Sequence, residues 1–434
     1  MSRKPVVRRE IEMQINDLSS DGFGRGQINA REIRLRNALP GEQVQGLVRK
    51  RKRRVDHGDA LTILEPSPAR QSPVCAVAHR CGGCTFQHAS ARYELDWKEG
   101  QLRKALERAG VAVERWQPPV AGPQHGYRHK ARLGVRWVSE QIYLGFREAF
   151  SGRVVDMRTC TILTPRLAAL ISPLRDRMAE LSIAARIPQI EVAAGDTTLA
   201  MVVRNLDALT DRDHELFRAF AADQRIEVFL QPAGPDSVVW LTGRGEPLGY
   251  SNPDFGLQFV FEPLDFVQVN PVTNRHLVRK AVLELADSTQ VLDLFCGLGN
   301  FSLALARTGK SVIGLEASET AVVRARLNAR RNGLQGRTVF EPVDLYGAPL
   351  QASLQSQSCD AILLDPPRLG AGPQLRTWLH AGVQTVVYVS CNPESFAKDA
   401  VVLGEVGLRL IEVGIYDMFP QTTHIETVGV FRRR

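Results

Sequence analysis

The cysteine at position 391 has the surroundings that point most directly to chemistry. It follows the apolar run 386–389 and Ser390, and it precedes Asn392, Pro393 and a helix-like stretch over residues 394–405. The apolar run predicts a buried strand, and the Asn-Pro pair predicts that a helix begins directly after the thiol. Because the N-terminal end of a helix dipole stabilises a thiolate, we predict that Cys391 is a nucleophile.

A glycine-rich turn upstream of this cysteine predicts a binding site for a nucleoside cofactor. Gly297 and Gly299, in segment 293–300, let the backbone turn tightly and approach a ligand, but the third glycine of a dinucleotide fingerprint is missing. Glu316 ends the next predicted strand, where a carboxylate can accept hydrogen bonds from ribose hydroxyls. Asp344 closes the following strand and is placed near an adenine edge. Together these residues favour S-adenosylmethionine over a nicotinamide dinucleotide.

Two further carboxylates come at the ends of predicted strands. Asp365 precedes a pair of prolines, and such a rigid strand exit can aim a carboxylate into a pocket. Glu426 lies just before the apolar run 428–431, where it can remove a proton from a substrate. From the residues alone, His424 is an equal candidate for that role. The remaining cysteines of this half, Cys296 and Cys359, have no such neighbours and are predicted to pack in the core.

The first half of the chain contains a cluster of cysteines with the spacing of a metal site. Cys75, Cys81 and Cys84 form the cluster, and Cys160 is the next cysteine along the chain. Four thiolates can hold either a 4Fe–4S cluster or a tetrahedral zinc ion. The spacing slightly disfavours zinc, which usually takes paired short spacings, and His79 is interpreted as a neighbour of the site.

Strand and helix patterns must position these residues. From about residue 263 onward, strands alternate regularly with helical segments, which predicts a doubly wound, mainly parallel sheet with ligands at the carboxyl ends of its strands. The predicted strands cover residues 291–295, 311–315, 338–342, 361–364 and 385–390. Residues 127–260 mix strand-like stretches with a helical segment around residues 165–181 and predict an α+β region.

The N-terminal segment has the pattern of a small β-barrel. Residues 6–65 contain short strand-like stretches separated by glycine-rich turns, which is typical of oligonucleotide-binding barrels. The basic run 49–54 lies within this module, and a proline-rich linker follows it. A barrel with a basic surface favours a nucleic-acid partner.

Composition narrows the class of protein further. The chain has 434 residues and a net charge of +8, with basic clusters at residues 49–54, 128–136 and 432–434, so a polyanionic partner is expected. The charge does not distinguish RNA from DNA. Apolar runs stay below the roughly 20 residues needed to span a bilayer, and the N-terminus has no signal-peptide core. Seven cysteines, an odd number, favour a reducing compartment, so we expect a cytoplasmic protein without a membrane segment.

The ordered series of motifs resembles the uracil C5-methyltransferases of RNA, and most closely the 23S ribosomal RNA enzymes that carry an N-terminal TRAM domain and an iron–sulfur cluster. The resemblance extends over almost the whole chain, in segments 16–18, 39–42, 75–90, 266–270, 293–297, 364–368, 389–393 and 417–420. It implies that Cys391 is the nucleophile and Glu426 the base. It places further residues at positions that bind S-adenosylmethionine or line the reaction pocket: Gln268, Phe295, Asn300, Glu316 and Asp365. At Asp344 the family often has asparagine, so its adenine contact is less secure.

The resemblance also implies an architecture and a substrate. It divides the chain into a TRAM barrel (6–66), a central α+β domain with the iron–sulfur cluster (70–92 and 119–262) and a Rossmann-like class I methyltransferase domain (93–118 and 263–434). It assigns Cys75, Cys81, Cys84 and Cys160 to a 4Fe–4S cluster with a structural role. The expected substrate is one uridine of 23S ribosomal RNA, methylated by a monomer that has no obligate protein partner.

The chemistry agrees with this resemblance, because uracil C5 is a poor nucleophile until a thiolate adds to C6. A base then removes the C5 proton, and the target must first be unstacked from its neighbours. Three alternatives stay open: a tRNA uracil C5-methyltransferase, an RNA cytosine C5-methyltransferase and a non-catalytic ribosome assembly factor. The tRNA relatives are expected to lack the cysteine cluster and the β module, so the segment before residue 91 argues against them. The intact Cys391, Glu426 and glycine turn argue against a degenerate factor.

Overall fold

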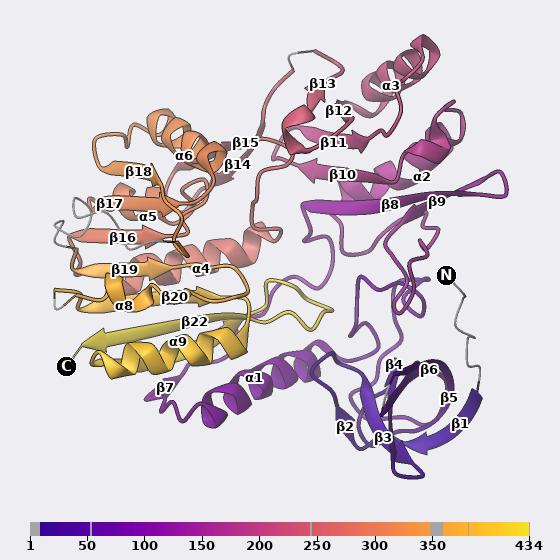
Figure 1. The fold of residues 1–434 in the computed structure, drawn as a ribbon, viewed down its shortest axis with the longest axis horizontal. Coiled ribbons are helices and arrows are strands. Elements are labelled where there is room, and N and C mark those ends of the chain that lie inside the picture. Colours follow the sequence, from indigo (N-terminus) through magenta and orange to yellow (C-terminus); the bar gives the residue numbers. More distant parts are fainter. Residues whose placement is uncertain (1–8, 53, 244, 348–358, 381, 434) are drawn as a thin grey trace.

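The computed structural model describes residues 9–52, 54–243, 245–347, 359–380 and 382–433. Figure 1 shows a curled N-terminal sheet, a middle part of mixed strands and helices, and a C-terminal part with helices on both faces of a sheet. Residues 6–8 of the predicted β module, and Arg53 and Arg434 of the basic clusters, lie outside the described residues. None of the described helices combines the length and apolar character that a membrane span requires.

The N-terminal sheet curls around its own small core. Its six strands are β1 (Arg9–Gln14), β2 (Asp17–Leu18), β3 (Gly24–Ile28), β4 (Arg31–Arg36), β5 (Gln43–Lys52) and β6 (Val55–Glu65), in the order β1-β5-β6-β4-β3-β2. Side chains alternate across a strand, so Ile33 and Leu35 of β4 both point inward and are fully buried. The curled sheet agrees with the predicted barrel, with one strand more than the five expected.

The middle part is a six-stranded sheet covered by helices. Its strands are β8 (Lys130–Val138), β9 (Gln141–Gly145), β10 (Gln189–Ala194), β11 (Leu199–Arg204), β12 (Ile226–Gln231) and β13 (Val239–Trp240), in the order β13-β12-β11-β10-β8-β9. Two α-helices, α2 (Pro165–Ala179) and α3 (Asp211–Gln224), pack on it, and the short 3-10 helices η1 (Ala184–Arg186) and η2 (Pro235–Ser237) lie in connections. Only β11 and β12 pair in parallel, because α3 carries the chain back between them. The hairpin β14 (Leu248–Asn252) and β15 (Leu257–Phe261) leads into the C-terminal part.

The C-terminal part is an eight-stranded sheet in the order β18-β17-β16-β19-β20-β22-β21-β7. The strands after the hairpin are β16 (Gln290–Leu294), β17 (Ser311–Glu316), β18 (Thr338–Pro342), β19 (Ala361–Leu364), β20 (Thr385–Ser390), β21 (Leu408–Tyr416) and β22 (Glu426–Arg433). The helices are α4 (Pro271–Glu284), α5 (Ser302–Arg307), α6 (Glu319–Arg331), α8 (Leu375–Trp378) and α9 (Pro393–Glu405). Strands β16 to β20 pair in parallel and β22 is antiparallel to both neighbours, which confirms the predicted doubly wound sheet.

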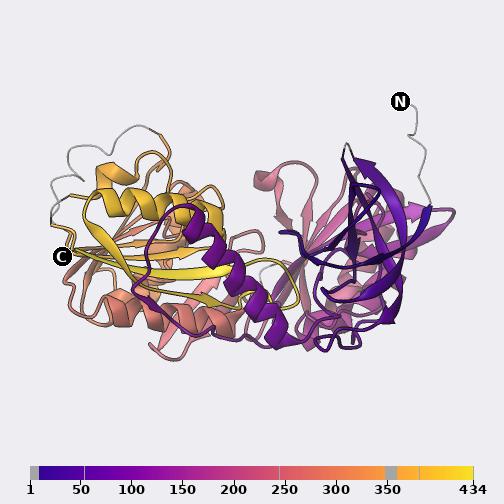
Figure 2. The same ribbon diagram turned by 90° about the horizontal axis from the view of Figure 1, so that it is seen from below.

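One segment that precedes the middle part in sequence packs on the C-terminal sheet. Helix α1 (Ala91–Arg108) begins at Ser90, whose side chain accepts a hydrogen bond from the backbone N–H of Tyr93, and it lies against α9 and β21. Strand β7 (Arg115–Trp116) then pairs in parallel with β21 at the edge of the sheet. Figure 2 shows α1 running across the molecule from the C-terminal part toward the barrel. The loop between β21 and β22, residues 417–425, reaches in the same direction (Figure 1).

Candidate active site

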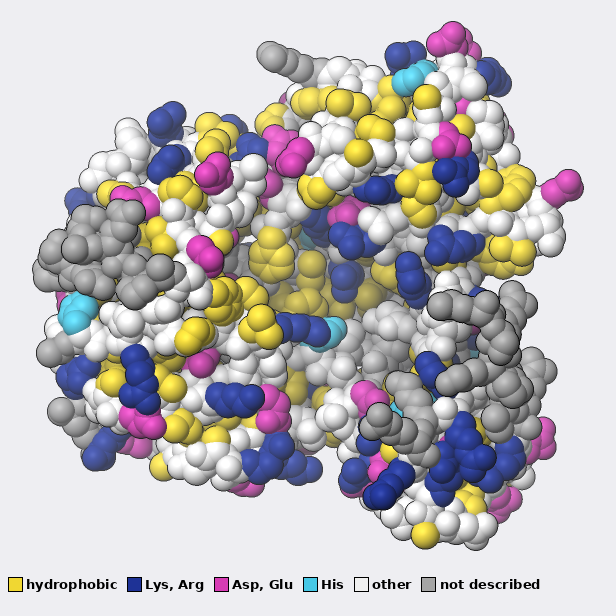
Figure 3. Space-filling view, in the orientation of Figure 1, with side chains coloured by type: hydrophobic (Ala, Val, Ile, Leu, Met, Phe, Trp, Pro, Cys, Tyr) yellow, Lys and Arg dark blue, Asp and Glu magenta, His cyan; other side chains and the backbone are white. Residues whose placement is uncertain are grey.

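A cavity of about 1140 Å³ opens where the carboxyl ends of β16, β17, β19 and β20 face the middle part of the molecule. The space-filling view shows this hollow between the two parts (Figure 3). Ligands of doubly wound sheets bind at this edge, because the loops that follow parallel strands meet there. Seven of the eight pocket residues expected from the sequence line the cavity: Gln268, Phe295, Asn300, Glu316, Asp365, Cys391 and Glu426.

The glycine turn after β16 has the backbone that its sequence predicts. Gly297 (φ 54°) and Gly299 (φ 91°) both adopt left-handed conformations. Phe295 (φ 65°) also has a positive φ, which is strained for a residue other than glycine. Glu316 holds the turn, since its carboxylate accepts a hydrogen bond from the Gly297 N–H at 3.2 Å. The amide of Asn300 pairs with that of Asn274 at 2.9 Å. The turn is therefore shaped before any ligand binds.

Acidic side chains line the cavity, and another lies buried behind its glycine turn. Asp293 is fully buried behind the turn, accepts a hydrogen bond from the Ser302 hydroxyl, and keeps one carboxylate oxygen without a hydrogen-bond partner among the described residues. Burial raises the pKa of Asp293 to about 7, and the nearby Asp365 and Glu316 raise it too. Carboxyl groups that lack a counter-charge favour a cationic ligand, so the pocket fits the sulfonium and ammonium groups of S-adenosylmethionine.

Asp365 and Glu426 are two acids that line the cavity. Burial raises the pKa of Asp365 to about 7, and a hydrogen bond from the Gln268 side chain opposes the rise. Burial also raises the pKa of Glu426 well above its usual value, with a contribution from Asp365, while the Arg368 guanidinium lowers it. Burial and the Asp365 charge therefore both disfavour the ionised form of Glu426, whereas Arg368 favours it.

Cys391 lies between these carboxyl groups and the start of α9. Burial raises the pKa of Cys391 to about 11, Glu426 and Asp365 add to the rise, and Arg368 opposes it. Burial and the two acids oppose the predicted stabilisation of a thiolate by the helix, which stays a prediction. The Oδ1 atom of Asn392 caps α9 by accepting a hydrogen bond from the Glu394 N–H at 3.1 Å. Positive charge in the pocket, such as that of Arg368, lowers the pKa of Cys391.

Arg368 and His424 form a polar pair in the cavity, of which the sequence analysis considered only His424, as an alternative base. The Nη2 atom of Arg368 lies 2.6 Å from the Nδ1 atom of His424, and both residues line the cavity. Burial lowers the pKa of His424 to about 4, and Arg368 lowers it further, so the imidazole is neutral and accepts a hydrogen bond from the guanidinium. His424 is thus engaged with Arg368, which leaves Glu426 as the better placed proton acceptor of the two.

The structure sets Asp344 apart from the other expected residues. Asp344 is exposed, does not line the cavity, and accepts a hydrogen bond from the Tyr346 backbone N–H at 3.0 Å. Its adenine contact stays a prediction. Conversely, Phe266 lines the mouth of the cavity with 75% of its surface exposed, beside Arg128. The motif 266–270 is the sequence signal that could have identified Phe266.

The four cysteines of the first half lie close enough to influence one another. Burial raises the pKa of Cys81 to about 11, and the charges of Cys160 and Cys75 raise it further. Burial likewise raises the pKa of Cys84, to about 12, and a hydrogen bond from the Gln87 side chain opposes this rise. In the part of the chain that the structure describes, no group of three or more His, Cys, Asp or Glu side chains has the arrangement of a metal site. The thiols are free, and as a donor set they suit a soft metal centre.

The loop that carries Cys75, Cys81 and Cys84 contacts all three parts of the molecule. Arg36 of the barrel is buried, pairs with Asp59 at 2.6 Å, and donates to the carbonyl oxygen of His79 at 2.7 Å. Directly after Cys84, the backbone N–H groups of Thr85 and Phe86 donate to the carbonyl oxygen of Gln421, in the loop before Glu426. The cysteine loop therefore connects the barrel to the cavity.

The fold and the cavity together define a methyltransferase of the Rossmann-like class. Residues 285–396 match a family model described as "Methyltransferase domain". The crystal structure of the Pyrococcus abyssi tRNA (uracil-54, C5)-methyltransferase in complex with S-adenosyl-L-homocysteine superimposes with a TM-score of 0.75. It is 23% identical and covers 97% of this chain and 100% of its own, so the two share their fold from the barrel to the C-terminal sheet.

Sequence relatives define the particular family. A protein of Alcanivorax borkumensis named 23S rRNA (uracil(1939)-C(5))-methyltransferase RlmD is 38% identical over 99% of this chain and 98% of its own length. A protein of the same name from Aromatoleum aromaticum is 40% identical over 96% of this chain and 99% of its own. The chain belongs to the RlmD family. One expectation from the sequence is wrong, however. We expected tRNA enzymes to lack the β module, but the Pyrococcus tRNA enzyme covers 97% of this chain, so the β module alone does not separate rRNA enzymes from tRNA enzymes.

Proposed function

We propose that this protein methylates C5 of one uridine in 23S ribosomal RNA, using Cys391 as nucleophile and Glu426 as base. Family membership over nearly the whole length supports the reaction and the RNA class. The observation that carries the residue roles is the register of β20 and β22, in which Ser390 pairs with Thr427. Cys391 and Glu426 are the residues that directly adjoin this last pair on the two strands, and both line the cavity.

The residues of the chain account for the steps. The Cys391 thiol gives up its proton to solvent, and the thiolate sulfur adds to C6 of the uracil, which opens the C5–C6 double bond and makes C5 nucleophilic toward a methyl group. S-adenosylmethionine, when bound, supplies the methyl group from its sulfonium centre. Glu426 then takes the C5 proton, C5–C6 becomes a double bond again, and the C6–S bond breaks. Arg368, the pocket group that lowers the pKa values of both Cys391 and Glu426, favours their ionised forms.

The cofactor contacts belong to the same proposal. Glu316 would hold the ribose hydroxyls, while Gln268, Phe295, Asn300 and Asp365 line the space for the rest of S-adenosylmethionine. Asp344 is retained only as an adenine neighbour that would have to turn toward the cavity. The acidic pocket and the preformed glycine turn support this assignment.

We further propose that Cys75, Cys81, Cys84 and Cys160 hold a 4Fe–4S cluster with a structural role. Cys81 and Cys84 are each influenced by the charges of other cysteines of this set, which supports one shared site, and four thiolates are the donor set of such a cluster. The division into a TRAM barrel (6–66), a cluster-bearing central domain (70–92 and 119–262) and a methyltransferase domain (93–118 and 263–434) is part of the same proposal.

Tritium release tests the function. RNA labelled with tritium at uridine C5 is incubated with S-adenosylmethionine and anaerobically purified protein, with 23S RNA and tRNA in parallel. We expect release from 23S RNA alone, no release by Cys391→Ala, and normal release by the matched control Cys359→Ala, whose thiol lies outside the cavity. Release from tRNA alone would assign the substrate of the Pyrococcus relative instead. Absence of release from both RNAs would overturn the methyltransferase proposal.

A further inference from the structure

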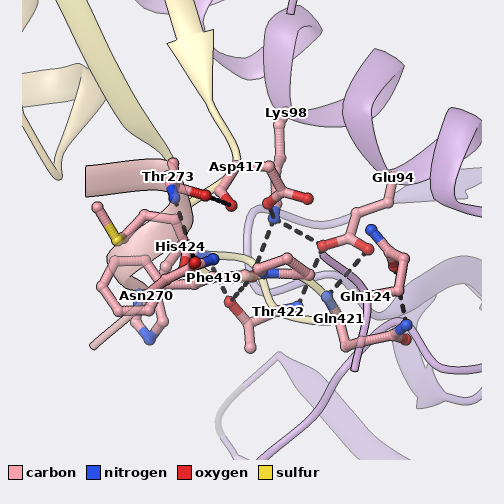
Figure 4. Close-up of polar contacts among 12 residues, drawn as sticks. Glu94, Lys98, Gln124, Asn270, Thr273, Asp417, Phe419, Gln421, Thr422 and His424 are labelled. Atoms are coloured by element: carbon pink, nitrogen blue, oxygen red, sulfur yellow. Dashed lines mark hydrogen bonds and ion pairs between the residues drawn. The ribbon is translucent and has the colours of Figure 1, made fainter. Parts of the chain in front are cut away.

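A lysine is buried between the α1 helix and the loop that precedes Glu426. Lys98 has 1% of its surface exposed, and its Nζ atom lies 2.6 Å from Glu94 and 2.7 Å from Asp417. Figure 4 shows the ammonium group between the two carboxylates. The three side chains are each at most 1% exposed, which is rare for charged groups. Replacing such a buried set by apolar residues is often neutral or stabilising, so stability alone does not explain its presence.

The contacts of Lys98 hold the loop that follows β21 as well as helix α1. The carbonyl oxygens of five consecutive residues, 417–421, each accept a hydrogen bond from elsewhere in the fold. The donors, in the order of these five carbonyls, are Thr273, Asn270, Lys98, Tyr127 and the backbone of Thr85 and Phe86. The Lys98 bond to the Phe419 oxygen measures 3.1 Å and is the charged one among them.

Glu94 fixes the other side of the same loop. Its carboxylate accepts hydrogen bonds from the backbone N–H of Gln421 at 3.0 Å and of Thr422 at 3.2 Å. Gln421 has a φ of 70°, a left-handed conformation that is unusual for a residue other than glycine. The paired Glu94 and Lys98 thus hold a strained backbone that would relax without them. Figure 4 shows Gln421 and Thr422 facing Glu94.

The held loop ends at the groups that line the cavity. The Thr422 hydroxyl accepts a hydrogen bond from the His424 N–H at 3.2 Å, and the His424 ring packs edge-on against Phe419 with 5.4 Å between centroids. Glu426 follows two residues later as the first residue of β22. Displacement of the loop would therefore move Glu426 and the His424–Arg368 contact, whereas Cys391 is held separately by β20 and α9.

We propose that Lys98 is a positioning residue for the proton-removal step: it locks the 417–425 loop so that Glu426 reaches the C5 proton of the uridine adduct. The proposal rests on the proposed function and adds a residue that touches neither the substrate nor the cofactor. It predicts that loss of Lys98 slows the second half of the reaction and leaves thiol addition intact.

The experiment measures the two halves separately in Lys98→Met and in Lys104→Met, a matched control on the exposed face of the same helix. RNA with 5-fluorouridine at the target traps the covalent adduct, because fluorine at C5 cannot leave as a proton, so its rate reports the steps before proton removal. Tritium release reports proton removal itself. For Lys98→Met we expect adduct formation at the wild-type rate and tritium release slowed on the order of a hundredfold. We also expect a methylated RNA–protein adduct to accumulate on natural RNA.

Other results would contradict either the role of Lys98 or the proposed function, and the two cases can be told apart. Equal slowing of both halves, or no slowing of either, overturns the positioning role. If Lys98→Met does not fold, the double variant Lys98→Met with Glu94→Gln removes one of the two carboxylates that lose their partner and is measured in its place. If both variants are unfolded, the role of Lys98 is structural and the proposal falls. Wild-type protein without adduct or tritium release would instead refute the proposed function.

Discussion

Replacing Asp365 by asparagine should stabilise the ligand-free protein and at the same time remove its activity. Asparagine keeps the shape and can still accept the hydrogen bond from Gln268, but it carries no charge. The folded-state pKa of Asp365 is raised to about 7 from a reference of 3.8, so the folded protein holds a proton that the unfolded chain releases. Stability is therefore lost as the pH rises from the lower to the higher value.

The size of the effect follows from that rise. About three pKa units at 1.36 kcal/mol each give about 4 kcal/mol for complete burial of the charge. Because water enters the cavity and screens part of this cost, we expect Asp365→Asn to gain about 2 kcal/mol at pH 8 and close to zero below pH 4. For a unit of the size of the C-terminal part, this gain corresponds to roughly 5 °C in Tm.

Thermal unfolding between pH 4.5 and 8.5, without cofactor, measures the difference directly. Asp344→Asn is the matched control, since Asp344 is exposed near the same edge of the sheet, and its Tm should follow wild type at every pH. A stability gain that is the same at pH 4.5 and pH 8.5 would show that charge burial is not the cause. A variant less stable than wild type at pH 8 would refute the electrostatic account of the pocket.

Three further outcomes follow from contacts described above. Cys391, with a pKa of about 11, should react slowly with iodoacetamide at pH 7.5 and faster as the pH approaches 11, as measured by mass spectrometry of its peptide. Arg36→Met should destabilise the barrel, because it removes the donor to the His79 carbonyl and a buried partner of Asp59. We expect the free energy of unfolding to fall by about 2 kcal/mol and proteolysis of linker 66–74 to become faster. Cys84→Ser, or removal of iron by a chelator, should abolish visible absorption and weaken RNA binding before S-adenosylmethionine binding, measured by filter binding and calorimetry.

The sequence predicted the elements that depend on local pattern. The five parallel strands of the C-terminal sheet lie within one residue of their predicted positions, because buried strands read as continuous apolar runs. The pocket residues follow from the rule that ligands bind at the carboxyl ends of such strands.

The features of the site that depend on long-range contacts could not be predicted from one sequence. The buried positions of α1 include Glu94 and Lys98 in line with Leu102, and this charged pair within an apolar stripe was the available signal. The role of this charged pair depends on Asp417, which lies 319 positions after Lys98 in the sequence. The pKa of Cys391 likewise depends on Glu426 and Asp365, whose burial and proximity only the fold reveals.

The placement of β7 and α1 has a consequence for how the protein is made. During synthesis these two elements leave the ribosome before the middle part, yet β7 pairs at the sheet edge with β21, which is the second-to-last strand of the chain. The apolar face of α1, with Leu102, Ala105 and Leu106, must wait for residues 408–433 before it is covered. Such distant pairing makes folding slow and exposes a nascent chain to chaperones. A fragment that starts at residue 263 would lack this edge strand and helix, so we expect it to aggregate, whereas a fragment that starts at residue 91 would retain them.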